Sequence, residues 1–282
     1  MKCKITKIAI IMLGLLLPFQ AFSASLVSDA SDSHTKSVSL SASYKLSTPF
    51  FNHFLIRETN LTSGIIANKR VLGLKNDILI NADEAIKNLS NFDFSEDYVP
   101  KYKNSLYGLS FLFGYSFKNL KVELEGLYES FDVRDTKNHI IDNNYRYFAL
   151  SKQDNLNSDY VTLINNGVKL YSVILNICYD FIGKNTSLTP FLCVGIGEDI
   201  INIFDAVRFK PAFHAKMGFN YRISERAFLF MDMYYHKIIG NQYSSISVKY
   251  PKVLVFPSTR SSVLAELDIG YLGSEVGIRI FI

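Results

Sequence analysis

Acidic and basic side chains occupy alternate positions in several segments of the sequence, as they would along one face of a β-strand. The residues of this face are Lys121, Glu123, Glu125, Glu129, Lys216, Arg222, Asp232, Glu275 and Arg279. Two arrangements fit such a face: a charged path for ions, or a salt-bridge network that fills a narrow barrel. An eight-stranded barrel leaves an interior only about wide enough for side chains, which favours the network. Within it, Asp232 is expected beside Lys216, diagonally across two paired strands.

Histidine chemistry has little support in the sequence. The sequence contains five histidines, and none of them forms the H-x-x-x-H spacing or a comparable metal-binding pattern. A three-residue turn at 224–226 places His214 opposite His236, where the pair could hold a metal ion or a proton, but an ordinary hydrogen-bonded pair is favoured. The chain also shows no Ser-His-Asp arrangement and no glycine-rich phosphate loop. We therefore expect no enzymatic activity, no cofactor and no metal.

Cys178 and Cys193 fall on the same inward face by parity. If the connection at 183–187 is symmetric, these two residues lie directly opposite each other, and Asp180 lies opposite Phe191. Directly opposed antiparallel residues have Cα atoms about 4.5 to 5.5 Å apart, within the range of a disulfide. Export would carry the chain through an oxidising compartment. The sequence leaves two alternatives: a disulfide, or two small apolar side chains that face a lumen.

Strands must position these residues, and the clearest pair is Tyr107–Phe131 with a turn at Lys118–Asn119. Aromatic and aliphatic residues alternate with glycine and serine on the first strand, and with charged residues on the second. Small residues cover a solvated sheet poorly, so an apolar face toward lipid and a polar face toward a lumen are more plausible. The same alternation predicts strands at 37–46, 171–181, 188–197, 213–223, 228–236 and 275–282.

The connections between these strands differ strongly in length. Short turns are expected at Lys118, Lys184 and Glu225. Long polar loops are expected at 48–104, 132–167, 198–210 and 237–261, with a helical turn at 81–89 in the first. Short periplasmic turns and long extracellular loops are typical of outer-membrane barrels. The sequence thus predicts an all-β fold: an eight-stranded antiparallel transmembrane β-barrel. Ten strands result if 61–74 spans the membrane as a hairpin and 263–282 divides in two; a soluble lipocalin-like barrel is the weaker alternative.

The first residues resemble a secretion signal. A start rich in lysine, an apolar run and the small-x-small site Ala21-Phe22-Ser23 predict a signal peptide at 1–23. A periplasmic segment at 24–36 and the barrel at 37–282 follow. Loss of the signal removes three lysines from a chain of net charge +4, so the mature chain is close to neutral. No basic patch interleaves with aromatic residues, which argues against a nucleic-acid partner.

Several segments resemble the immunodominant major surface antigens of Ehrlichia and Anaplasma, a surface antigen family of outer-membrane proteins. They are Val122–Glu125, Tyr128–Val133, Tyr145–Ser151, Asn176–Asp180, Cys193–Gly197 and His236–Asn241. The resemblance runs from about Ser105 to the C-terminus. It implies a barrel in the bacterial outer membrane of a vector-borne intracellular pathogen, exposed to host immunity. It also implies a porin-like activity, because relatives are described as porins.

Two functions follow as hypotheses. One is a surface-exposed antigen, held by outer-membrane lipid, whose loops meet host-cell surface molecules or antibodies. The other is a passive porin for small solutes, which the family resemblance supports and the narrow eight-stranded interior opposes.

Overall fold

The computed structural model describes residues 36–60, 66–67, 70–151, 160–182, 187–248 and 261–282. The expected signal peptide, and all but the last residue of the segment 24–36, lie outside these ranges. No helix in the described ranges is long and apolar enough to cross a membrane.

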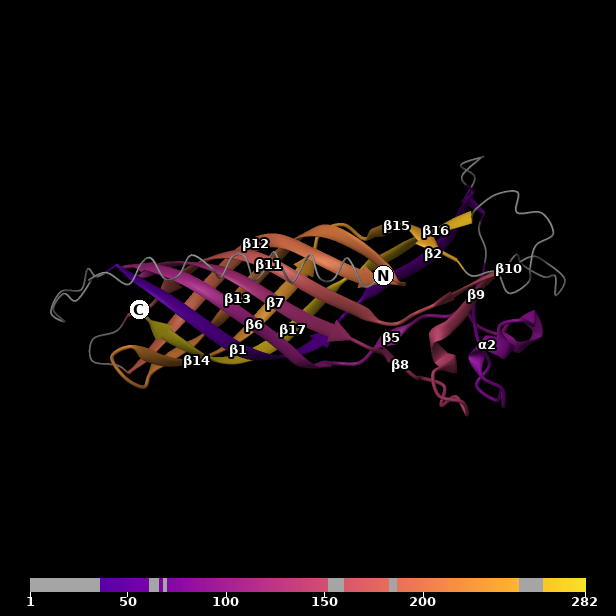
Figure 1. Cartoon of the computed structure of the whole chain (residues 1–282), viewed down its shortest axis with the longest axis horizontal. Coiled ribbons are helices and arrows are strands. Elements are labelled where there is room, and N and C mark those ends of the chain that lie inside the picture. Colours follow the sequence, from indigo (N-terminus) through magenta and orange to yellow (C-terminus); the bar gives the residue numbers. More distant parts are fainter. Residues whose placement is uncertain (1–35, 61–65, 68–69, 152–159, 183–186, 249–260) are drawn as a thin grey trace. The chain divides into compact units, whose positions relative to one another are not determined.

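Eight strands form a closed antiparallel barrel (Figure 1). They are β1 (Ser37–Pro49), β6 (Ser105–Phe117), β7 (Leu120–Phe131), β11 (Val168–Asp180), β12 (Leu188–Ile203), β13 (Ala206–Arg222), β14 (Ala227–Ile238) and β17 (Gly270–Phe281). Each pairs with the next of the eight along the chain, and β17 pairs with β1 to close the barrel. The predicted eight-stranded barrel is confirmed. The ten-stranded alternative is wrong, because the run 263–282 does divide but its first part, β16 (Ser261–Asp268), pairs outside the barrel.

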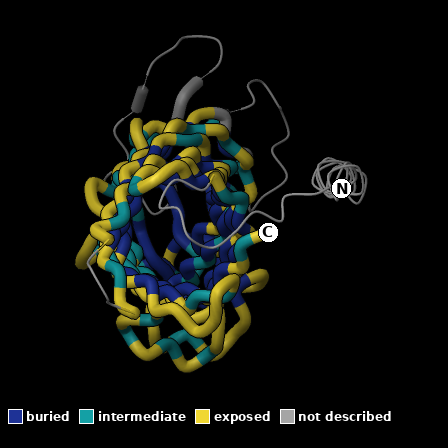
Figure 2. Tube along the Cα trace, turned by 90° about the vertical axis from the view of Figure 1, so that its left-hand side faces the viewer, coloured by how far each residue is buried: buried dark blue, intermediate teal, exposed yellow. Residues whose placement is uncertain are grey.

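Period-two alternation produces these strands. Along the barrel, exposed and buried residues alternate, as Figure 2 shows in its bands of yellow and blue. The exposed positions are largely apolar; Phe111, Ile177 and Met217, for example, are 68%, 56% and 61% exposed. In the middle of the barrel many of the buried positions are serine, glycine or charged residues, and a few are apolar, such as Leu112 and Ile174. An apolar outer belt around a polar interior is the pattern of a membrane-spanning barrel.

The two ends of the barrel differ. At one end, here called the turn end, Lys118–Asn119 joins β6 to β7, and Ile223–Arg226 joins β13 to β14. The C-terminus lies at this end (Figure 1). The turn after Phe117 has the predicted register, with Phe117 opposite Leu120. The other end, here called the loop end, carries the long connections.

The described parts of the long connections form sheets and short helices, which together we call the cap (Figure 1). One sheet contains β2 (Asn52–Asn60), β3 (Ile66–Ala67), β15 (Gln242–Ser247) and β16; a second contains β4 (Arg70–Gly73), β9 (Tyr147–Ser151) and β10 (Tyr160–Ile164). A third is the pair β5 (Lys101–Tyr102) and β8 (Val133–Arg134). The helices are α2 (Ala82–Ala85), η2 (Leu89–Asn91) and η3 (Asn144–Arg146). The helical turn expected at 81–89 is present, with Asn81 as the N-cap of α2.

Three expectations for the connections need correction. Residues 198–210 are not a loop, since β12 and β13 run through them to a two-residue turn at Phe204–Asp205, where both residues have positive φ. The described parts of 61–74 do not form a hairpin, because β3 pairs with β2 and β4 pairs with β9. The expected loops 48–104, 132–167 and 237–261 contain the cap strands except β16, which begins at the last residue of the third loop. The first residues of 48–104 and 237–261 belong to β1 and β14, which run to Pro49 and Ile238.

A large apolar cluster fills the loop end of the barrel and the base of the cap. Its barrel members include Phe131, Val168, Leu170, Ile201, Ile203 and Tyr271, and its cap members include Ile56, Phe148, Leu150, Val161, Leu163 and Val263. All of these side chains are buried. The interior therefore changes from polar to apolar toward the loop end.

Candidate functional site

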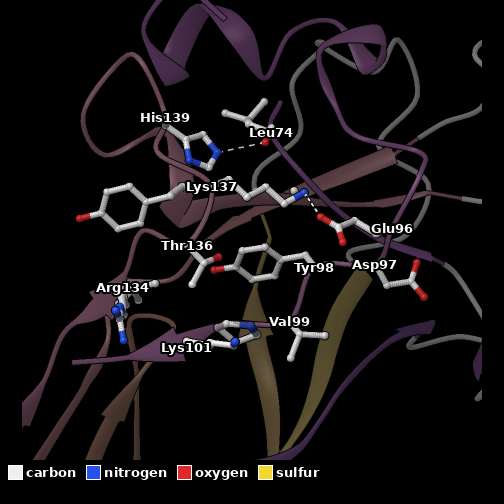
Figure 3. A pocket seen from close by; sticks show the side chains of 14 residues that line it. Leu74, Glu96, Asp97, Tyr98, Val99, Lys101, Arg134, Thr136, Lys137 and His139 are labelled. Atoms are coloured by element: carbon white, nitrogen blue, oxygen red, sulfur yellow. Dashed lines mark hydrogen bonds and ion pairs between the residues drawn. The ribbon is translucent and has the colours of Figure 1, made fainter. Parts of the chain in front are cut away.

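Two parts of the molecule gather side chains that could act: the polar interior of the barrel and a pocket in the cap. The pocket has a volume of about 300 Å³, and it is lined by residues of 73–101 and 133–145 (Figure 3). The barrel interior holds most of the charged residues that the sequence singled out.

Four charged residues form a closed ring of ion pairs across the middle of the barrel. Lys45 Nζ lies 2.8 Å from Glu125 and 2.9 Å from Glu275. Lys216 Nζ lies 2.6 Å from Glu125 and 3.0 Å from Glu275. All four side chains are at most 2% exposed. They come from β1, β7, β13 and β17, of which only β1 and β17 are neighbours in the sheet, so the ring also joins strands on separate walls of the barrel.

A second group lies between this ring and the turn end. Arg279 contacts Glu123 at 2.7 Å and donates to the Asn220 side-chain oxygen at 2.6 Å. Its guanidinium also lies 4.9 Å from the centre of the Phe230 ring. Lys121 Nζ lies 3.3 Å from Glu123. Arg279 and Lys121 thus share one carboxylate, which neutralises part of their charge.

Two of the expected network residues lie elsewhere in the interior and form no ion pair with a residue that the structure describes. Glu129 accepts hydrogen bonds from Ser47 at 2.6 Å and from Tyr234 at 2.7 Å. The Asp232 carboxylate is buried and has no hydrogen-bond partner among the described residues. The register confirms Asp232 as the diagonal neighbour of Lys216, since Lys216 lies opposite Tyr234. Lys216 nevertheless forms its ion pairs with Glu125 and Glu275.

Arg222 does not belong to the network. Its side chain is exposed at the turn end of β13, and its guanidinium lies 5.7 Å from the Phe228 ring centre. The position is correct in parity but too close to the strand end to reach the interior. Lys45, by contrast, is a central member that the sequence argument did not single out. Its inward parity on a serine-rich strand was the signal that could have identified it.

The histidine pair lies on the loop-end side of the ring. His214 Nδ1 is 3.0 Å from His236 Nδ1, and His236 Nε2 is 2.8 Å from the Asp199 carboxylate. Because a carboxylate accepts, a neutral His236 donates a hydrogen bond to Asp199 through Nε2, and its Nδ1 accepts a hydrogen bond from His214 Nδ1. Both Nδ1 atoms take part in this bond, so His214, His236 and Asp199 form a hydrogen-bonded chain.

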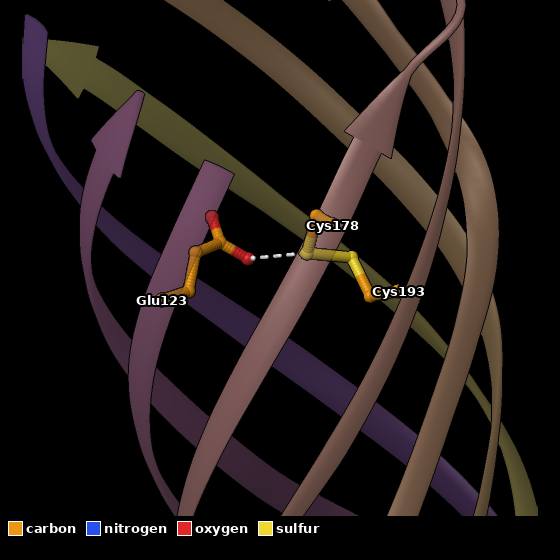
Figure 4. A group of neighbouring side chains, drawn as sticks. All are labelled: Glu123, Cys178 and Cys193. Carbon is orange, nitrogen blue, oxygen red and sulfur yellow. Dashed lines mark hydrogen bonds between the residues drawn. A yellow bond between two sulfur atoms is a disulfide. The ribbon is translucent and has the colours of Figure 1, made fainter. Parts of the chain in front are cut away.

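A disulfide joins Cys178 to Cys193 on the inward face of β11 and β12 (Figure 4). The two residues are directly opposed, and Asp180 is opposed to Phe191. A carboxylate oxygen of Glu123 lies 3.4 Å from the Cys178 sulfur. The three residues are close enough together to share a metal ion. They do not fit one in this state, however, since a disulfide sulfur is not a thiolate, which is the form that binds metals.

Glycines make room for the large side chains of the interior. A Cβ on Gly273 would collide with the Tyr234 ring, and a Cβ on Gly195 would collide with the Asn176 side chain. The Tyr234 ring in turn lies 4.1 Å from Lys45 Nζ. Chemically, the ring of Lys45, Glu125, Lys216 and Glu275 holds separate walls of the barrel together, because each of its charges is paired with charges of opposite sign.

Comparison with known proteins gives both sequence and structural similarities. A family model described as surface antigen matches residues 30–282. The major surface antigen 4 of Anaplasma marginale is 24% identical over 232 residues, which cover 82% of this chain and 79% of that protein. Among solved structures, Neisserial surface protein A gives a TM-score of 0.39 at 10% identity, covering 87% of this chain and 96% of that one. The attachment invasion locus protein of Yersinia pestis gives 0.28 at 11% identity, covering 87% and 97%.

Proposed function

Since the family model covers nearly the whole chain, the chain belongs to the surface antigen family, and we propose that it displays an ordered cap outside the cell on a closed barrel. It is a surface-exposed β-barrel protein of the bacterial outer membrane. The proposal adds that the loop end faces outward, that the cap meets host-cell surface molecules or antibodies, and that the chain has no catalytic role.

The ring of Lys45, Glu125, Lys216 and Glu275 carries this proposal. Ion pairs across the middle of the barrel, and the apolar cluster beyond them, occupy the space that a solute would need. Opening such a path would separate buried charges, which costs several kcal/mol for each uncompensated ion. These features support display over the alternative of a passive porin.

The cap has the construction expected of a displayed surface. The cap has an apolar core of its own. Leu72, Phe92 and Ala149 are fully buried in this core, which is separate from the apolar cluster at the loop end of the barrel. The outer surface of the cap carries exposed ion pairs, such as Lys87 with Glu84 at 2.6 Å, beside exposed apolar side chains such as Leu79. A surface held by secondary structure and an apolar core suits recognition by a partner, because less ordering entropy is lost on binding.

Labelling of single cysteines on intact bacteria tests the orientation. Ser90→Cys places a thiol on the exposed surface of the cap, and Glu225→Cys places one in the exposed turn between β13 and β14. A membrane-impermeant maleimide should label the cap variant on intact cells and the turn variant only after the outer membrane is opened. The reverse pattern would overturn the proposed orientation.

A further inference from the structure

The strand pair β5–β8 places two unpaired bases side by side at the pocket in the cap. Lys101 lies directly opposite Arg134 in the antiparallel register. Directly opposed residues have Cα atoms about 4.5 to 5.5 Å apart, and like charges in this arrangement are destabilising. Both side chains are exposed, and neither forms an ion pair with any described residue. Figure 3 shows them on the same side of the pocket.

The acidic groups around the pocket are already paired with other bases. Glu96 forms an ion pair with Lys137, and Asp97 lies 2.9 Å from the Arg70 guanidinium. The pocket is therefore lined by two free cations, while its two carboxylates are each held by a different base. This distribution favours a negatively charged ligand.

The other residues that line the pocket indicate what kind of molecule carries the negative charge. The Tyr98 ring forms one wall and is fixed from behind by the Phe148 ring, whose centre lies 4.9 Å away in a stacked arrangement. Val99 and Pro100 add apolar surface beside it, and Thr136 adds a hydroxyl group. A volume of about 300 Å³ lies at the small end of ligand pockets, which fits one ring-sized unit and not a peptide.

We propose that this pocket binds a single sugar unit that carries a sulfate or a carboxylate. Arg134 and Lys101 bind the anionic group, Arg134 through two parallel N–H donors. The Tyr98 ring and the adjoining apolar residues pack against the sugar ring, and Thr136 contacts a hydroxyl group. The inference rests on the proposed function in one respect, because an external sugar reaches the pocket only if the cap faces outward.

Binding of small sugars to the full chain, folded in detergent micelles, tests the pocket independently of orientation. The probes are glucose 6-sulfate and glucuronate, with glucose and inorganic sulfate as controls, and saturation-transfer NMR gives the affinities. At least one of the two charged sugars should bind saturably, and uncharged glucose at least about tenfold more weakly. Raising the salt concentration should weaken the binding, because the bases are exposed.

Matched variants locate the site. The double variant Lys101→Ala with Arg134→Ala should weaken binding by tenfold or more, while Lys87→Ala, an exposed base elsewhere in the cap, should leave it unchanged. Unaltered heat-dependent migration in gels checks that each variant is folded. Three results would overturn the inference: no saturable binding of either charged sugar, equal binding by the double variant, or equally tight binding of inorganic sulfate, which would mean an adventitious ion only. Failure here alongside correct cysteine labelling would leave the proposed function standing.

Discussion

The barrel interior and the cap are both filled by buried side chains, but the side chains are of different kinds. In the interior, Lys45, Glu125, Lys216 and Glu275 meet across the lumen as ion pairs. In the cap, aromatic rings such as Phe148 fill the space, and charged groups stay at the surface. We therefore expect the barrel to lose stability when an ion pair of the ring is broken, and the cap to lose stability when side-chain volume is removed from its core.

The largest effect is expected from a broken charge ring. Glu125→Gln leaves Lys45 and Lys216 with one shared carboxylate, and removing one partner of a buried pair costs about 3 to 5 kcal/mol. Unfolding by urea in micelles, followed by circular dichroism, measures the change. Glu84→Gln is the control, because Glu84 and Lys87 are more than half exposed and such pairs contribute about 0 to 1 kcal/mol. Equal stability of the two variants would remove the distinction between interior and surface.

A cavity in the cap should act locally. Phe148 is fully buried among Tyr98, Phe54 and Phe204, with ring centres 4.9 to 6.3 Å away. Phe148→Ala should cost the cap about 3 kcal/mol. Hydrogen exchange should become faster in β9 and β10 and stay slow in the barrel strands. Leu79→Ala, at a position 75% exposed, is the control and should change neither. Equal loosening of barrel and cap would show that the two regions are not energetically separate.

The disulfide should contribute less than the charge ring. Cys178 and Cys193 are 15 residues apart, and strand pairing already holds them together. Replacing both by serine should cost about 2 kcal/mol, toward the low end for a disulfide. The urea midpoint of the wild type should fall to that of the variant when reductant is added, and the variant should not respond. If reductant also lowered the urea midpoint of the variant, the loss of stability would have a cause other than this disulfide.

The smallest effect concerns Asp93 in the cap. Partial burial alone would raise its pKa, but hydrogen bonds from Lys137 and Ser95 lower the pKa to about 2. A folded-state pKa below the unfolded value means stability that is present above about pH 4 and lost as the pH falls toward 2. Asp93→Asn should therefore destabilise the cap slightly at pH 6 and match the wild type near pH 2. Hydrogen exchange of the cap at the two pH values measures this, and a pH-independent difference would contradict it.

Much of the barrel could be predicted from the sequence, because alternation fixes which side of the sheet each residue faces. The register of Cys178 and Cys193 followed from one symmetric connection. Alternation says nothing, however, about which inward residues meet across the lumen. Lys216 and Glu275 come from strands separated by β14, so their contact depends on barrel closure. The same limit applies to Asp232, because the register makes it the diagonal neighbour of Lys216 but does not say which carboxylates Lys216 contacts.

Period-two alternation does not predict the strand ends near the cap or the strands of the cap itself. In the middle of the barrel the inward face is polar, but near the loop end it becomes apolar, as Ile201 and Ile203 show. Polar and apolar residues therefore no longer mark the inward and outward faces at 198–210, and the sequence predicts a loop there instead of strands. The turn at Phe204–Asp205 also lacks the glycine or asparagine that usually marks positive φ. The cap strands are short and pair with segments distant in the sequence, which leaves no local signal of their partners.

Conductance in planar bilayers tests the central claim most directly, because a filled interior and an open channel differ in current at once. The refolded wild-type chain should insert without producing steady channels, since the ion-pair ring and the apolar cluster occupy the lumen. Insertion itself is checked by protease protection of the barrel strands in the same membranes. Steady, large and weakly selective currents from the inserted wild type would contradict a closed display barrel and favour a passive porin.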